Sequence, residues 1–341
     1  MLLSLSKSME NNKVAGKATI VLAGDIGATK TNLTFFKIEG GHLALLHEAQ
    51  FKSNDYKNIV ELTNAFTKDI LLLPDSICFG VAGPVLNGHA KLSNLDWEID
   101  SDELSDHFKI KNVHLINDLE ATAYGLAMLN ETDVAIIHKG DDAGYGNAAV
   151  IAPGTGLGEA GLFWDGNYYH PFATEGGHSD FAPRNEFDFE LFTFLQKKFD
   201  HVSWEHLVCG PGIVNIYQFL REEKKREEPG WLKEEIMKED AAAVISRRVL
   251  QSEICKETMQ LFIRFLAYES ANLVLKLKAT GGLFIGGGIA PQIVSLLENN
   301  AFHASFCQSG RLNYLLEKVP VKIILNAKTA LLGAAFYGAK N

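Results

Sequence analysis

Short apolar runs recur along the chain, and most of them end in glycine or a small polar residue, which is typical of buried β-strands. Such runs cover residues 18–23, 33–38 and 76–84, and a further one lies near the end of the chain at 321–325. Between them, apolar residues at three- and four-residue spacing predict helices. These helices are expected over residues 58–70, 187–199, 241–278 and 329–337. The pattern as a whole predicts an α/β protein.

One apolar run ends on Asn117-Asp118, and a helical pattern begins directly after it. Asp118 therefore lies at a predicted junction between a strand and a helix. Aspartate is a favoured helix N-cap, and a cap explains this residue well by itself. The alternative is a catalytic base. The residues around the junction leave both roles open.

Two loops rich in glycine and threonine follow predicted strands, the first at residues 24–32 and the second at residues 153–158. Glycines let the backbone approach a ligand closely, and hydroxyls and backbone amides suit phosphate oxygens. Asp25 in the first loop could hold a metal ion through water. A tight hairpin without a ligand explains the first loop equally well when it is taken alone.

The second loop continues as G-x-G-x-x-G over residues 156–161, with Asp180 about 20 residues further on, so a dinucleotide-binding fold must be considered. That fingerprint requires a helix after the glycines. Residues 162–169 instead have the pattern of an aromatic-rich hairpin with an Asp165-Gly166 turn. A phosphate cradle between two strands is the interpretation that remains, and no G-x-x-x-x-G-K-[ST] motif indicates a P-loop.

The two loops repeat one unit of strand, glycine-threonine turn and returning strand. We therefore expect two similar α/β halves that face each other across a cleft. A length of 341 residues also favours about two domains. The expected parts are a disordered tail over residues 1–17, a small domain over 18–128 plus 322–341, and a large domain over 129–321.

Residues 174–180 concentrate a carboxylate, Glu175, and an imidazole, His178, around two glycines. Such groups accept and donate hydrogen bonds to hydroxyls, so this cluster suits a polyol better than a phosphate. A zinc site is a rival interpretation, but neither H-E-x-x-H nor H-x-H spacing supports it. A turn with exposed charges is the plain alternative. Asn94 in a polar loop and Glu205 in a predicted first helical turn could likewise bind a hydroxyl or serve only the local structure.

A third glycine-rich segment, residues 281–291, has the pattern of a strand, a triple glycine and a helix with proline in its first turn. Glycines without side chains suit a flat ring or a ribose packed on the backbone. Glycines at such a turn also often serve its geometry alone.

The composition narrows the classes of function. A net charge of −10 argues against a nucleic-acid or anionic-membrane surface, because both need clustered Lys and Arg. The four cysteines are far apart and form no C-x-x-C pair, which favours buried thiols in a reducing cytosol. No apolar stretch reaches the roughly 18 residues that a membrane span needs, and the first residues make a poor signal peptide. Small-molecule chemistry is the favoured class.

Taken together, these motifs resemble the ATP-dependent bacterial glucokinases of the hexokinase, actin and heat-shock ATPase superfamily. The resemblance runs in order from about Ile20 to Gly333, which is nearly the whole chain. The segments that carry it are residues 24–29, 116–118, 152–158, 175–178 and 284–289. It implies a two-domain actin-like ATPase (ribonuclease H-like) fold with an interdomain cleft, a cytoplasmic homodimer, and glucose, ATP and Mg²⁺ as ligands.

The resemblance also implies roles for single residues. Asp118 would be the catalytic base that takes the proton of the sugar 6-hydroxyl, and Asp25 would hold Mg²⁺ through water. The residues that would bind the sugar are Asn94, Asn117, Asp118, Glu175, His178 and Glu205. Those that would bind ATP are Gly24, Asp25, Gly27, Ala28, Thr29, Lys30, Thr31, Gly154, Thr155, Gly156, Gly158, Gly286, Gly287 and Gly288.

Two features depart from the family pattern. Ala28 stands where family members often have a second glycine, and the N-terminal extension is longer than usual. The cysteine-rich zinc motif of the related repressor and sugar-kinase group is absent from the sequence, which separates the chain from that group.

Other functions remain open at this stage. One enzyme alternative is a kinase of another hexose or an amino sugar, or one that uses polyphosphate or ADP as the donor. The non-enzyme alternatives are a sugar-sensing regulator and a filament-forming ATPase. The short N-terminal tail has no room for a DNA-binding helix pair, and a filament has no use for the Glu175–His178 cluster.

Overall fold

The computed structural model describes Leu3, Leu5 and residues 18–40, 42–92, 95–141, 146–298 and 300–340. Asn94 and the predicted tail, apart from Leu3 and Leu5, lie outside the described residues. The chain divides into two compact units. Unit 1 comprises Met1–Asp133, Leu162–Ala173 and Asn326–Asn341, and unit 2 comprises Val134–Gly161 and Thr174–Leu325.

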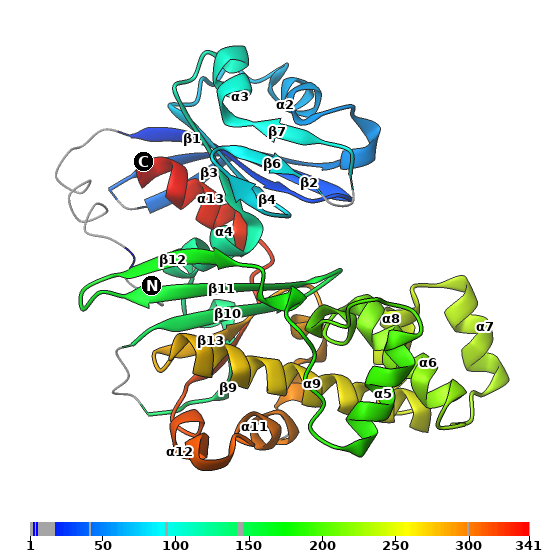
Figure 1. The fold of residues 1–341 in the computed structure, drawn as a ribbon. Coiled ribbons are helices and arrows are strands. Elements are labelled where there is room, and N and C mark those ends of the chain that lie inside the picture. The colour runs from blue at the N-terminus through cyan, green and yellow to red at the C-terminus, as the bar shows by residue number, and fades with distance from the viewer. Residues whose placement is uncertain are drawn as a thin grey trace. The chain divides into compact units, whose positions relative to one another are not determined.

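Unit 1 is built on a five-stranded sheet with the order β3-β2-β1-β4-β8 (Figure 1). The strands β1, β4 and β8 run parallel, whereas β2 and β3 are antiparallel to their neighbours. Strand β4 is buried along its whole length, as a central strand covered on both faces should be. The bounds of the strands are β1 Thr19–Ile26, β2 Lys30–Glu39, β3 His42–Lys52, β4 Ser76–Val81 and β8 Asn112–Asn117.

Helices cover both faces of this sheet. On one face, α2 (Ile59–Thr67) and α3 (Ser101–Phe108) close a core that includes the small sheet of β5 (Val85–Leu86), β6 (His89–Lys91) and β7 (Glu98–Asp100). On the other face lie α4 (Asp118–Gly125) and α13 (Thr329–Lys340), which pack against each other (Figure 1).

Two glycines let α4 and α13 approach closely. A Cβ atom on Gly333 would overlap the carbonyl oxygen of Ala121, and one on Gly125 would overlap that of Thr329. Because side chains are absent at both positions, the backbones of α4 and α13 come into contact at the middle and the end of α4.

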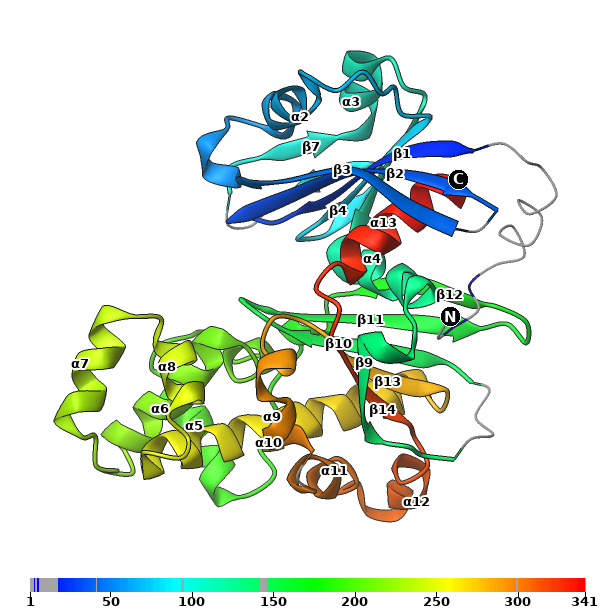
Figure 2. The ribbon, with the colours of Figure 1, turned by 180° about the vertical axis from the view of Figure 1, so that it is seen from behind.

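The second large sheet, most of which belongs to unit 2, has six strands in the order β12-β11-β10-β13-β14-β9. The long helix α9 packs on this sheet, and α11 lies beside α9 (Figure 2). A large apolar core joins the sheet to these helices and to the bundle of α5, α6, α7 and α8. The strands are β9 Val134–His138, β10 Ala148–Pro153, β11 Leu157–Trp164, β12 Tyr169–Thr174, β13 Gly282–Ile285 and β14 Val321–Ile324. The helices are α5 Glu186–Gln196, α6 Gly210–Glu222, α7 Gly230–Lys238, α8 Ala241–Arg247, α9 Glu253–Leu277, α10 Val294–Leu297, α11 Ala301–Phe306 and α12 Asn313–Leu316.

The predicted α/β class and the hairpin with the Asp165-Gly166 turn are confirmed, since β11 and β12 flank that turn. The single helix predicted over residues 241–278 is wrong. The chain leaves helical geometry after α8, and α9 starts only after Ser252, whose backbone is extended (φ −144°, ψ 124°). Between them, Arg248 binds Glu235 of α7 at 2.8 Å.

Among the described residues, no helix combines the length and the apolar character needed to cross a membrane.

Candidate active site

The carboxyl ends of three parallel strands bring two predicted site residues to one edge of the unit 1 sheet. In the strand register, Asp25 of β1 pairs with Gly80 of β4, and Val81 of β4 pairs with Asn117 of β8. Asp118 follows directly as the first residue of α4. A Cβ atom on Gly80 would lie 3.0 Å from Cβ of Ala121 and 3.8 Å from Cα of Asp118. Gly80 is the strand partner of Asp25. Because it has no side chain, the start of α4 can lie close to β4.

The helix N-cap at this junction is Asn117 and not Asp118, so the predicted cap is wrong by one residue. The Oδ1 atom of Asn117 accepts hydrogen bonds from the backbone N–H groups of Leu119 at 2.8 Å and Glu120 at 3.3 Å. Its Nδ2 donates to the carbonyl oxygen of Gly83 at 3.0 Å, and within the described residues this is the one bond that its two amide hydrogens make, so the second can serve another acceptor.

Asp118 is half-buried in the first turn of α4, and its Oδ1 accepts from the N–H of Leu119 at 2.9 Å. Asn117 is the N-cap, so α4 does not need the carboxylate of Asp118 as its cap. The hydrogen bond from the N–H of Leu119 orients that carboxylate. This arrangement fixes the backbone of a potential base on a rigid element.

The first glycine-threonine loop is tighter than predicted, because strand pairing between β1 and β2 continues up to Ile26 and Thr31. Thr31 is buried, and its hydroxyl lies 3.0 Å from that of Ser53. Ser53 in turn donates to the carbonyl oxygen of Gly27 at 2.6 Å. Ser53, which the sequence analysis missed, thus braces the loop from the inside. Thr29 and Lys30 are exposed at its tip, and Ala28 is half-buried.

Gly24 serves packing, because a Cβ atom there would lie 2.6 Å from the ring of Phe79 and 2.9 Å from Leu33. Gly27 closes the turn by donating its N–H to the carbonyl oxygen of Lys30 at 3.0 Å. The half-buried Asp25 accepts a 3.4 Å hydrogen bond from Asn32. Burial raises the pKa of Asp25, and the bond from Asn32 opposes this rise. A cation beside this carboxylate would favour its charged form.

The second glycine-threonine loop lies against Glu205 within unit 2. The N–H of Leu157 donates to Oε2 of Glu205 at 2.8 Å, and a Cβ atom on Gly156 would lie 2.5 Å from the same oxygen. The loop closes on itself through a 2.8 Å bond from the N–H of Gly154 to the carbonyl oxygen of Gly156. Gly158 lies further along, inside β11, and is half-buried.

The predicted polyol residues gather on neighbouring segments of unit 2. Glu175 precedes the 3-10 helix η4 (Gly176–His178), and Glu205 lies in η5 (Trp204–His206). These segments are joined by a 3.1 Å bond from the N–H of Trp204 to the carbonyl oxygen of Ser179. A Cβ atom on Gly177 would overlap the carbonyl oxygen of Leu157, so the turn also rests on the second loop. Glu175 and His178 are exposed, and Glu205 is half-buried.

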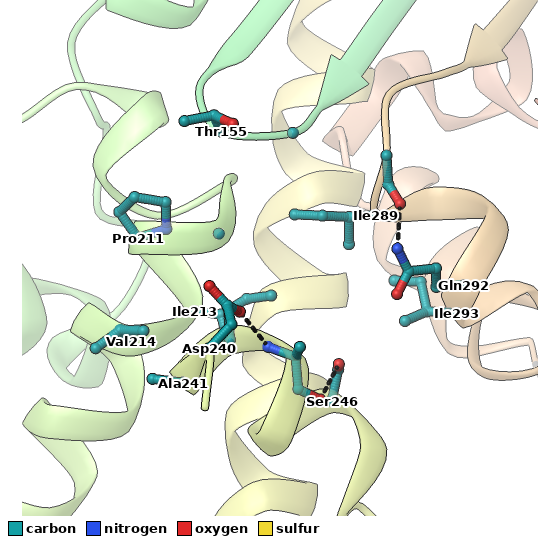
Figure 3. A pocket seen from close by; sticks show the side chains of 15 residues that line it. Thr155, Pro211, Ile213, Val214, Asp240, Ala241, Ser246, Ile289, Gln292 and Ile293 are labelled. Atoms are coloured by element: carbon teal, nitrogen blue, oxygen red, sulfur yellow. Dashed lines mark hydrogen bonds between the residues drawn. The ribbon is translucent and has the colours of Figure 1, made fainter. Parts of the chain in front are cut away.

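A cavity of about 450 Å³ lies beside the second loop, entirely within unit 2 (Figure 3). Gly154 and Thr155 line it, and Figure 3 shows Pro211 and Val214 on one side of it and Gln292 and Ile293 on the other. Most of the wall is apolar, with a few polar groups such as Asp240, as expected of a small-molecule pocket. The residues that line it are Gly154, Thr155, Gly210, Pro211, Ile213, Val214, Asp240, Ala241, Ala242, Ala243, Ser246, Gly288, Ile289, Gln292 and Ile293.

Of the predicted triple glycine, only Gly288 lines this cavity. Gly286 is buried and donates its N–H to the carbonyl oxygen of Ile151 at 2.8 Å. Gly287 has a φ of +76°, and a Cβ atom there would overlap the carbonyl oxygen of Pro153. Gly286 and Gly287 therefore determine the geometry of the turn, and Gly288 forms part of the cavity wall.

Sequence reasoning missed the walls supplied by the starts of α6 and α8. Two residues in the sequence mark these helix starts. Pro211 lies in the first turn of α6, and Asp240 is the N-cap of α8, where its side chain accepts from the N–H of Ala243 at 2.8 Å. Within the described ranges, no group of three or more His, Cys, Asp or Glu residues has a geometry that could hold a metal ion.

The fold is that of solved sugar kinases. A glucokinase from an Antarctic psychrotroph has a TM-score of 0.81 with 29% identity, covering 95% of this chain and 99% of its own. A glucokinase from Balamuthia mandrillaris, solved in complex with glucose, has a TM-score of 0.78 with 22% identity, covering 99% and 100% of the two chains. The chain thus has the fold of hexose kinases of the two-domain actin-like ATPase class, which confirms the predicted fold class.

Sequence comparison identifies the family. The glucokinase family model matches residues 22–341. A glucokinase of Nostoc sp. is 41% identical over 340 residues, covering 94% of this chain and 99% of the relative. The chain belongs to the glucokinase family, as its motifs predicted.

Proposed function

We propose that the chain transfers the γ-phosphate of ATP to the 6-hydroxyl of glucose, which gives glucose 6-phosphate and ADP, and that Asp118 is the general base. The observation that carries the proposal is the strand register of unit 1. It supports a common site for Asp25 and Asp118 at the carboxyl edge of β1, β4 and β8. In open α/β sheets, ligands bind at this edge of the strands.

The phosphoryl group is transferred with little covalent help from protein, so positioning and charge neutralisation dominate the catalysis. Asp118 accepts the proton of the attacking hydroxyl. Asn117 fixes the helix start that carries Asp118, and its remaining amide hydrogen binds a sugar hydroxyl. Glu175, His178 and Glu205 accept and donate hydrogen bonds to the other hydroxyls.

ATP is bound through both glycine-threonine loops and the cavity of unit 2. The exposed Thr29 and Lys30 of the first loop bind phosphate oxygens, and the adenosine lies in the cavity beside Gly288 and Ile289. The mixed lining of that cavity, apolar with a few polar groups, supports a nucleoside.

The residues of the first loop fit Mg²⁺. Asp25 is a half-buried carboxylate, and among the described residues its side chain is hydrogen-bonded only by Asn32, at 3.4 Å. Asp25 would hold the ion through water, and the ion when bound neutralises charge on the phosphate oxygens. We also propose the cytoplasmic homodimer that the family resemblance implies.

The experiment that tests the function is a coupled assay for ADP release with ATP as donor and glucose, mannose, fructose and N-acetylglucosamine as acceptors. Glucose should give the highest kcat/KM. If another sugar exceeds glucose by about tenfold or more, which corresponds to about 1.4 kcal/mol in transition-state binding, the assigned acceptor is wrong. Replacing ATP with polyphosphate or ADP tests the donor, with glucose 6-phosphate formation as the readout, because neither of these donors releases ADP.

A further inference from the structure

Two carboxyl groups meet in the interior of unit 2, directly beneath the Glu175–His178 turn. Glu159 of β11 has 1% of its surface exposed, and Glu269 in the middle of α9 has none exposed. A side-chain hydrogen bond joins the two groups. Two carboxylates contain no donor, so this bond requires a proton on one of them.

The surroundings assign the charge to Glu269 and the proton to Glu159. Asn272 donates to Glu269 at 2.8 Å, and Lys276 pairs with it at 3.4 Å. No donor in the described part of the chain reaches Oε1 of Glu159. Burial, and next the charge of Glu269, raise the pKa of Glu159 to about 8. Glu159 is therefore a neutral acid at neutral pH.

The carboxyl group of Glu159 lies directly against the turn. A Cβ atom on Gly176 would overlap its Oε2, so the turn's backbone rests on this side chain. The hydroxyl of Thr174 also links Glu159 to Gly176. It donates to the carbonyl oxygen of Glu159 at 3.0 Å and accepts from the N–H of Gly176 at 3.3 Å. Glu175 precedes Gly176, and His178 follows it by two residues.

We propose that Glu159 and Glu269 share one proton and that this proton fixes the Glu175–His178 turn in the position that binds the sugar. Glu159 is then a positioning residue for glucose. This inference rests on the proposed function, which assigns the turn to the sugar. When the proton is lost, two adjacent buried carboxylates repel each other, Glu159 moves, and Gly176 moves with it.

The other charged groups around the pair act on it in known directions. Burial raises the pKa of Glu269, and the hydrogen bond from Asn272 and the charges of Lys276 and Arg184 oppose this rise. The Cζ atom of Arg184 lies 3.9 Å from the centre of the Tyr268 ring, and its guanidinium also interacts electrostatically with Asp188. Glu175 and His178 are the ionisable side chains of the turn itself. All of these groups are unchanged in a Glu159→Gln variant, so a comparison with the wild type isolates the shared proton.

The test measures KM and kcat for glucose at saturating ATP from about pH 6.5 to about pH 9.5. In the wild type, KM should rise at least about fivefold as the pH passes the pKa of Glu159, and kcat should change much less. Glu159→Gln keeps a neutral donor toward Glu269, so its KM should stay flat over this range. Glu159→Val lacks the donor, so its KM should be raised at every pH.

Glu228→Gln is the matched control, because Glu228 is a carboxylate of the same unit bound to Tyr217 and Arg221. This variant should keep the alkaline rise. A wild-type KM that is flat with pH, or an equal rise in Glu159→Gln, would overturn the inference.

Unfolding in urea tests the shared proton without any activity. Because the folded state holds the proton that the unfolded state loses above pH 4.5, the stability of the wild type falls as the pH rises from 4.5 to about 8. Glutamine does not ionise, so the stability of Glu159→Gln relative to the wild type should increase over that window and then level off. A difference that is constant with pH contradicts the shared proton. If no hexose is phosphorylated at all, the proposed function fails, and this measurement still decides on the proton.

Discussion

The backbone N–H of Leu157 donates a 2.8 Å hydrogen bond to the carboxylate of Glu205. One residue of the second glycine-threonine loop is thereby joined to one residue of the proposed sugar site. The position of the loop and the orientation of the carboxylate are consequently not independent, and a change in either should alter the binding of both substrates.

Gly156→Ala tests this connection. The added Cβ atom would lie 2.5 Å from Oε2 of Glu205, which is too close, so the carboxylate or the loop must move. We expect KM to rise about tenfold or more for both ATP and glucose, because displacements of about 1 Å can cost up to 10²-fold in rate. Gly230→Ala, where the added atom has nothing within 4 Å, is the control and should behave like the wild type. A rise in KM for only one substrate would contradict the link.

Thr31→Val tests the brace inside the first loop. The substitution removes a buried hydroxyl that bonds to Ser53, so it should lower the free energy of unfolding by about 1 kcal/mol and raise KM for ATP. Thr63→Val is the control, since the hydroxyl of Thr63 is buried without a hydrogen-bond partner in the described structure. That variant should be as stable as the wild type or more so, with unchanged kinetics. Equal losses in both variants would argue against the brace.

Asn117→Ala separates capping from catalysis. The loss of the cap should lower the free energy of unfolding by about 1–2 kcal/mol, and because α4 carries Asp118, kcat should fall as well. Asn58→Ala removes the equivalent cap of α2, where Asn58 accepts from the N–H of Glu61 at 2.9 Å. It should cost comparable stability and leave kcat unchanged. Urea unfolding measures the loss of stability in both variants, and steady-state kinetics measures whether kcat falls in Asn117→Ala alone.

Ala243→Trp tests the cavity as the adenosine site. A large ring on this exposed wall residue should occupy part of the 450 Å³ and raise KM for ATP at least about tenfold, while KM for glucose changes little. Ala44→Trp introduces the same side chain at an exposed position of β3 and should leave both constants unchanged. An unaltered KM for ATP in Ala243→Trp would place the nucleoside elsewhere.

The elements predicted correctly are those that carry their signals locally. Strand β4 is a short apolar run that ends in small residues, and α2 starts at a side-chain cap, Asn58. The outer strand β3 was missed because it is largely exposed and its apolar residues do not alternate with polar ones. The break between α8 and α9 was missed because residues 248–252 contain neither glycine nor proline to mark it.

The candidate site divides in the same way. Motif residues such as Asp25, Gly156 and Glu175 could be selected from the sequence because glycine and carboxylate patterns are local. The cavity could not, because its walls come from α6, α8 and the segment around Ile289, which are joined only by folding. The cap at Asn117 was also beyond reach, since either residue of Asn117-Asp118 is a favoured cap and only the backbone geometry distinguishes them.

The role of Asp118 is the central claim, and Asp118→Asn tests it most directly. Asparagine retains an oxygen that can accept from the N–H of Leu119, so the start of α4 should persist. Glucose affinity, measured by calorimetry, should change less than about threefold, and kcat for ATP-dependent glucose phosphorylation should fall by about 10²–10⁴-fold. Turnover close to that of the wild type in Asp118→Asn would contradict the assignment of Asp118 as the base.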